Sequence, residues 1–150
     1  MKAWELVSIV FSTLVSGMFW GPWLALTRSM SALEPEIFLA VVRRLNLNMA
    51  PVMTFLMPVA LLSLVPVLVI SYNEQPETFA LYVAGLVLFL VALLVSVVVE
   101  VPIVKQIETW TVSTLPDDWQ QLRDRWGVFH IVRIVASFVG LVLLLVAVIH

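Results

Sequence analysis

Four long runs of apolar residues constrain this chain more than any other feature of its sequence. They cover residues 6–26, 49–70, 79–99 and 128–149, and the first three contain no charged residue. A helix needs about 20 apolar residues to cross the roughly 30 Å hydrocarbon core of a bilayer. We therefore predict an all-α membrane protein: a single four-helix transmembrane domain over residues 1–150.

The composition supports this class and removes others. Hydrophobic residues make up 62% of the chain and charged residues 12%, whereas a soluble domain carries about 25% charged residues. The chain has no cysteine, which excludes disulfides, thiolate metal ligands and cysteine nucleophiles. The net charge of −2 gives no reason to expect a nucleic-acid partner. The first apolar run is longer than a typical signal-peptide core and no small-x-small cleavage site follows it.

The basic residues predict an orientation in the membrane. The connections at residues 27–48 and 100–127 carry three basic residues each, whereas the turn at residues 71–78 carries none. By the positive-inside rule, the two basic connections lie in the cytoplasm. We therefore predict a multi-pass protein of the cell's inner (plasma) membrane with both termini on the non-cytoplasmic side. A reporter fused after His150 should therefore read non-cytoplasmic, and a cytoplasmic reading would overturn this topology.

The two basic connections resemble each other. In each, a proline is followed by acidic residues and then by a helical pattern with basic residues near its end. Pro35 and Pro116 fit the first turn of a helix, where carboxylates complement the helix dipole. We expect helices that begin near these prolines and continue into spans two and four on the cytoplasmic side, with a bend near Pro51. The alternative is a short interfacial helix that ends before each span. The predicted architecture is two similar helical hairpins related by a pseudo-twofold axis along the membrane normal.

The hydrogen-bonding residues gather at the cytoplasmic ends of the spans. Arg133 lies about one turn inside the fourth run, and burying an unpaired charge there costs several kcal/mol. Glu100, at the end of the third run, is its natural partner, and His130 lies one turn before Arg133. The alternative is that Arg133 reaches lipid phosphates and Glu100 only marks a helix end.

These residues define a candidate site. Its predicted catalytic residues are His130, Glu100 and Arg133. No metal site is expected, because the two histidines lie at opposite ends of one helix. Several of the predicted tryptophans also fit an interfacial aromatic belt. The predicted ligand-binding residues are Trp20, Trp23, Arg28, Asn48, Met53, Ser96 and Trp126.

A series of motifs in the second half of the chain points to a family. The motifs are Val-Pro-Ile at 101–103, Glu-Thr-Trp at 108–110, Leu-Pro-Asp-Asp-Trp at 115–119 and Phe-His-x-x-Arg at 129–133. This half resembles the anthrone-oxygenase-like family of small four-span membrane proteins. The first half is similar more loosely, through residues 17–22 and 48–51. Val104 stands where the family usually has an asparagine.

The resemblance implies a reaction for a few family members, the oxidation of an anthrone to an anthraquinone by O₂ with no metal or flavin cofactor. An anthrone is a carbon acid whose enolate is electron-rich. On this reading His130 is the base, oriented by Glu100, and Arg133 or Asn48 holds the enolate oxygen.

Three functions compete at this point. The first is a membrane protein that binds a lipophilic small molecule or lipid in an inner-leaflet cavity without chemistry. The second is the oxygenase implied by the resemblance. The third is a small transporter or a partner-binding membrane subunit. The expected partners are membrane lipids, a lipophilic ligand and further copies of the chain in a homo-oligomer.

Overall fold

The computed structural model describes all residues, 1–150, and contains helices and no strands. Four helical segments are long and apolar enough to cross a membrane, which confirms the predicted all-α, four-span fold. The elements in chain order are α1 (Lys2–Ala25), the 3₁₀ turn η1 (Thr27–Ala32), α2 (Pro35–Glu74), α3 (Pro76–Val95), the π-helical turn η2 (Ser96–Glu100), α4 (Val101–Glu108), the 3₁₀ turn η3 (Val112–Thr114) and α5 (Trp119–Ile149).

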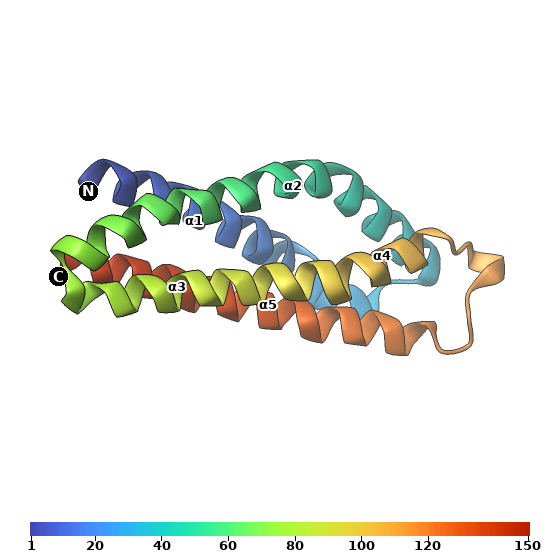
Figure 1. Ribbon diagram of the computed structural model, residues 1–150. Coiled ribbons are helices and arrows are strands. Elements are labelled where there is room, and N and C mark those ends of the chain that lie inside the picture. Colours follow the sequence, from blue (N-terminus) through green and yellow to red (C-terminus); the bar gives the residue numbers. More distant parts are fainter.

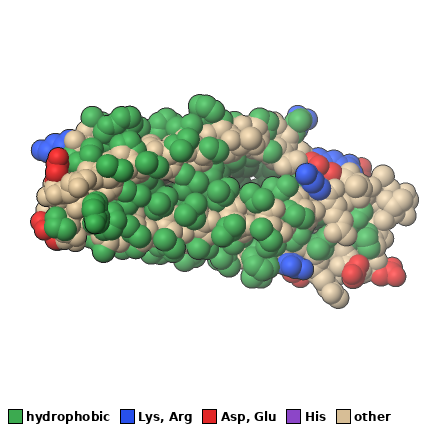
Figure 2. Space-filling view, in the orientation of Figure 1, with side chains coloured by type: hydrophobic (Ala, Val, Ile, Leu, Met, Phe, Trp, Pro, Cys, Tyr) green, Lys and Arg blue, Asp and Glu red, His purple; other side chains and the backbone are tan.

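The helices form one elongated bundle, in which α1 packs along α2 and α3 packs along α5 (Figure 1). Both termini lie at the same end of the bundle, and the η3 connection lies at the other end (Figure 1). Hydrophobic side chains cover the middle of the visible face, while most charged side chains lie near the two ends (Figure 2). The side of the membrane on which each end lies, and the likeness of the two hairpins, stay predictions.

Helix α2 runs without interruption from Pro35 to Glu74 and is bowed along its length (Figure 1). Pro51, Pro58 and Pro66 lie inside it. A proline removes one backbone hydrogen bond and its ring pushes against the preceding turn, so prolines are the usual cause of such bends. The predicted start at Pro35, continuation into the span and bend are therefore all present.

Helix α5 also continues into its span, but it begins at Trp119, three residues later than the predicted start near Pro116. The Trp119 N–H donates to the Pro116 carbonyl at 3.2 Å, so these residues form a turn before the helix. The predicted start was wrong because the two aspartates after Pro116 are equally suited to a turn.

Glycines allow α3 and α5 to approach each other closely. A Cβ atom at Gly140 would lie 3.2 Å from the Gly85 carbonyl oxygen and 3.2 Å from the Leu88 Cβ. Small residues allow such close backbone approach between membrane helices, where dispersion contacts replace the hydrophobic effect as the driving force. This contact fixes how α5 presents its polar residues to α3.

The third span changes its winding near its end. The Val101 N–H donates to the Ser96 carbonyl, five residues back, which makes η2 a π-helical turn between α3 and α4. Pro102 follows directly and has no N–H to offer, so the regular α-helical ladder is interrupted here. Single π-turns of this kind occur often at functional sites. This one carries both Ser96 and Glu100.

A second apolar cluster organises the η3 end of the bundle. It is separate from the main core of the spans and joins η1, α2, α4 and α5. The Arg43 guanidinium donates to the Trp110 carbonyl, which ties α2 to the end of α4. The buried members are Met30, Phe38, Leu39, Val42, Ile103, Ile107, Trp110 and Trp126.

Candidate functional site

Three ionisable side chains meet inside the bundle, on the π-turn η2 and on α5. Arg133 Nη2 lies 3.3 Å from Glu100 Oε2 and 2.7 Å from His130 Nδ1, and Arg133 Nε lies 3.1 Å from the same His130 nitrogen. Glu100 is 2% exposed and His130 is 3% exposed. Arg133 therefore has partners for its charge within the bundle, and its side chain is only 16% exposed.

The arginine decides which nitrogen of His130 carries the proton. A guanidinium has donors and no acceptor, so the Nδ1 atom that it contacts must accept the hydrogen bond. The proton of the neutral imidazole then sits on Nε2. This atom is buried and makes no hydrogen bond of good geometry within the chain, although the Phe19 carbonyl of α1 lies within its reach. The Nε2–H of His130 is therefore a donor that a ligand in the cavity can engage.

The Glu100 carboxylate is also incompletely satisfied. Its Oε2 lies 3.3 Å from Arg133 and 3.8 Å from His130 Nδ1, yet neither carboxylate oxygen makes a hydrogen bond of good geometry. Buried polar atoms are almost always hydrogen-bonded in folded proteins. Glu100 and His130 lie side by side and both carry unsatisfied polar atoms, so a ligand or water can bind there.

Aromatic and hydroxyl groups hold the cluster in position. The Trp126 ring stacks on the His130 ring with centroids 5.4 Å apart and an angle of 19° between the planes. The Arg133 guanidinium lies 4.7 Å above the Phe19 ring of α1 and donates to Ser96 Oγ at 3.1 Å. All of the cluster's supports therefore come from α1, η2 and α5.

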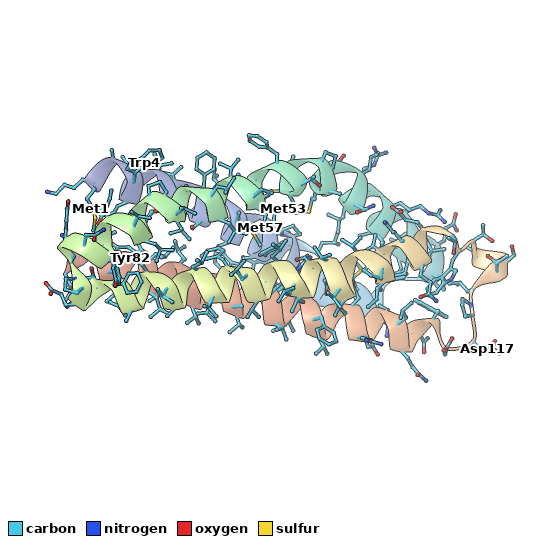
Figure 3. The ribbon with its side chains drawn as sticks, viewed as in Figure 1. Met1, Trp4, Met53, Met57, Tyr82 and Asp117 are labelled. Carbon is cyan, nitrogen blue, oxygen red and sulfur yellow. The ribbon has the colours of Figure 1, made fainter.

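The cluster forms part of the wall of a cavity of about 230 Å³. This lies just below the usual range of roughly 300–1,000 Å³ for small-molecule pockets. The rest of the wall is mainly apolar and comes from α1, η1, α2, α3 and α4. A hollow beneath the bowed part of α2 is visible in the space-filling view (Figure 2). Met53 and Met57 of α2 lie between α2 and α3 (Figure 3), and both line the cavity.

Six of the ten predicted site residues line this cavity. Met53 comes from α2, Ser96 and Glu100 from η2, and Trp126, His130 and Arg133 from α5. The last three share one face of α5 because they are spaced by four and three residues.

The other four predicted residues lie outside the cavity wall. Trp20 is 49% exposed and Arg28 and Asn48 are exposed, while Trp23 is half-buried. Steps of four residues drift round a helix, so Trp20 lies about 120° from the buried Ser8 face from which it was predicted.

The cavity's amide is Asn46 and not Asn48. Two residues along a helix correspond to a rotation of about 200°, which turns Asn48 to the opposite side of α2. Asn46 lines the cavity and donates to Glu108 Oε1 at 2.7 Å.

A second buried polar contact lies at the end of the bundle that holds the termini. The Tyr82 hydroxyl donates to Glu5 Oε1 at 2.7 Å, and both residues are buried. Tyr82 lies at the same end of the bundle as Met1 and Trp4 (Figure 3), and it precedes Glu100 by 18 residues along the third span. The sequence gives no signal for this contact, because Glu5 directly precedes the first apolar run, where an acidic residue is common at a helix start.

The arrangement offers a carboxylate, a neutral imidazole N–H and a fixed positive charge at an apolar cavity. It brings together no group of three or more histidine, cysteine or acidic side chains. Such a set can accept a proton from a ligand and stabilise negative charge on a ligand oxygen.

Comparison with known proteins gives one finding. No curated protein and no solved structure matches the chain significantly. A family described as anthrone oxygenase matches residues 46–143, which is more than half of the chain and includes Glu100, His130 and Arg133. This agrees with the resemblance seen in the motifs between residues 101 and 133. The chain belongs to the anthrone oxygenase family.

Proposed function

We propose that this protein binds a lipophilic aromatic ketone with an acidic C–H bond in its cavity and catalyses the oxidation of that carbon by O₂. The observation that carries the proposal is the pair of buried, unsatisfied polar groups on Glu100 and His130 at the wall of an apolar cavity. The support for an anthrone as the substrate is the description of the family to which the chain belongs.

Binding would orient the ketone by its oxygen. The carbonyl accepts a hydrogen bond from the Nε2–H of His130, while the fused aromatic rings occupy the apolar part of the cavity. Arg133 keeps a positive charge in contact with His130 Nδ1. As the carbonyl becomes an enolate, this donor and this charge stabilise the developing negative oxygen more than they stabilise the ketone.

Glu100 would be the base. Its carboxylate oxygens have no hydrogen bond, so they are free to take the proton from the CH₂ carbon. These roles are the reverse of those predicted from the sequence for Glu100 and His130. The reason is that Arg133 occupies the Nδ1 atom that would have to donate to Glu100 if His130 Nε2 were the base.

The enolate then reacts with O₂ itself. One electron passes to O₂, and the resulting radicals combine to form a C–O bond, which gives a hydroperoxide at the former CH₂ carbon after protonation. Loss of one water from this hydroperoxide leaves the second carbonyl of the quinone. Glu100 returns its proton to the peroxide oxygen, takes the remaining C–H proton as the O–O bond breaks, and passes that proton to the departing hydroxide to form water. One O₂ is consumed and one water is released for each anthrone.

The test uses the protein in lipid nanodiscs with anthrone, an oxygen electrode and the absorbance of anthraquinone. Wild-type protein should consume one O₂ per anthrone faster than empty nanodiscs do. Glu100→Gln and His130→Ala should each lower kcat by about 10²–10⁴-fold, the usual contribution of a positioned acid or base. Arg28→Ala, at an exposed residue outside the cavity, is the control and should keep the wild-type rate.

Binding without chemistry is the second candidate, favoured by the largely apolar wall. It predicts that anthrone or anthraquinone binds to wild-type protein, and binds more weakly to Arg133→Ala, while O₂ uptake equals that of empty nanodiscs. Rates unaffected by Glu100→Gln and His130→Ala would overturn the catalytic proposal.

A further inference from the structure

We infer that the cavity takes its ligand sideways from the bilayer, through a mouth between α2 and the third span. The cavity wall itself indicates where the mouth lies. Of all the residues that line the cavity, four are exposed at the surface. Ala50 and Thr54 lie on α2, and Val97 and Val101 lie opposite them on η2 and α4.

The rest of the lining is less exposed. The lining residues from α1, η1 and α5 are all buried or half-buried, so the exposed part of the wall belongs to α2 and the third span. Helix α2 packs against α3 and against α4, yet makes hardly any backbone contact with the η2 turn between them. Helix α2 also bows away from the third span along its middle (Figure 1). The opening therefore lies beside η2, where Glu100 enters the cavity wall.

Two features of the sequence produce this separation. Pro51 lies between Ala50 and Thr54 and interrupts the hydrogen-bond ladder of α2 at the mouth. On the opposite side the π-turn widens the third span by one residue between Ser96 and Glu100. Pro51 bends α2 and the π-turn widens the third span, and the two features border the same opening.

The depth of the mouth fits access from lipid. Ala50 lies six residues from Arg44, which is about 9 Å along a helix, and Val101 lies four residues from Lys105, which is about 6 Å. Basic side chains of this kind mark the edge of the hydrocarbon region. The mouth consequently opens just inside that edge, and its rim is alanine, threonine and two valines.

Such a mouth selects ligands by chemistry. It admits a flat, uncharged aromatic molecule that dissolves among lipid chains and carries its one polar oxygen near the headgroups. That oxygen enters at the depth of Glu100 and His130. Charged, water-soluble molecules have no corresponding route, because the bordering residues offer them no charge or backbone donor. This route deepens the proposed function, since it names how that same cavity would be filled.

The test uses the absence of cysteine in the native chain. A single cysteine replaces Met53, a half-buried residue of the cavity wall, and the protein is placed in phosphatidylcholine nanodiscs. A lipid-soluble pyrene maleimide and a sulfonated, water-soluble maleimide then compete for the thiol. We expect the pyrene reagent to label it at least tenfold faster than the sulfonated reagent.

Large side chains placed at the rim of the mouth should block it, and a neighbouring position that does not line the cavity provides the control. Val97→Trp and Val101→Trp should each slow labelling of Met53→Cys by pyrene maleimide about tenfold or more. Val98→Trp is matched, because Val98 is 67% exposed on the same turn but does not line the cavity, and it should leave labelling unchanged. Gel filtration of each variant checks folding, and two independent obstructions keep the test valid if one variant misfolds.

The outcomes separate this inference from the proposed oxidation. Faster labelling by the sulfonated reagent, or equal slowing by Val97→Trp, Val101→Trp and Val98→Trp, would overturn the lateral route. The measurement involves no turnover. If the pyrene reagent labels the thiol through the mouth but the protein does not oxidise anthrone, the lateral route stands and the oxidation is refuted. If the protein oxidises anthrone but labelling does not depend on the mouth, only the lateral route is refuted.

Discussion

The ion pair between Arg133 and Glu100 allows a prediction of stability in kcal/mol. At 3.3 Å, its Coulomb attraction is about 5 kcal/mol for an effective dielectric constant of about 20. Desolvation of both groups offsets much of this, so the net value of the pair is small, whereas removing one partner leaves an uncompensated buried charge. Arg133→Met should therefore lower the free energy of unfolding by about 3–5 kcal/mol.

The reverse single variant should cost less. In Glu100→Gln, Arg133 keeps its hydrogen bonds to His130 and Ser96 and its position over an aromatic ring. We expect a loss of about 1–2 kcal/mol, of the order of an imperfectly compensated polar group. In the double variant no unpaired carboxylate remains, so its loss should be smaller than the sum of the two singles by about 2 kcal/mol.

The assay is reversible unfolding in mixed dodecylmaltoside and dodecyl sulfate micelles, followed by circular dichroism. Arg28→Met, which removes an exposed arginine, is the matched control and should change the unfolding free energy by less than about 0.5 kcal/mol. Additivity of the two single variants within about 0.5 kcal/mol would show that the two charges do not interact. That result would refute the ion pair and favour an Arg133 that reaches lipid phosphates.

Three further predictions concern packing and the second polar contact. Gly140→Val should lower the free energy of unfolding by about 1–3 kcal/mol in the same assay, because the backbone of α3 lies where the new side chain would go. Gly127→Val is the control and should be tolerated, because the space around Gly127 is open. Equal losses of stability in the two variants would refute the glycine contact. Tyr82→Phe should lower the free energy of unfolding by about 1–3 kcal/mol, because Glu5 loses its hydrogen-bond donor, and it should leave anthrone turnover unchanged. Tyr72→Phe, at an exposed tyrosine, is the control. Trp126→Leu removes the ring stacked on His130 and should lower kcat for anthrone about tenfold, because the His130 donor is then misplaced. Circular dichroism should show little change in fold. An unchanged kcat would mean that the stacking does not position His130.

The fold was largely predictable from hydrophobicity. Four apolar runs of membrane-spanning length gave the spans, and Pro35 with its following acidic residue marked the start of α2 correctly. The start of α5 was misplaced because Pro116 and two aspartates suit a turn as well as a first helical turn. The π-turn at Ser96–Glu100 was not predictable, since a change in helix winding leaves no periodic signal in a segment that is apolar on all sides.

The cluster of the site was predictable for a different reason. A charge such as Arg133 inside an apolar run demands a partner, and few residues at that depth can provide one. The remaining wall of the cavity depends on which face of α1 and α2 turns inward. In helices that are apolar all round, the sequence carries little information on that rotation, so Trp20 and Asn48 were expected in the wall while Phe19 and Asn46 line it.

The proposed function requires that the cavity at Glu100, His130 and Arg133 holds a discrete lipophilic ligand. The most direct measurement is native mass spectrometry and organic extraction of protein purified in mild detergent, for wild type, His130→Ala and Arg133→Ala. We predict that a discrete aromatic or quinone-like molecule accompanies the wild-type protein and is lost from both variants. Recovery of bulk phospholipid alone, in equal amounts from all three proteins, would contradict the account.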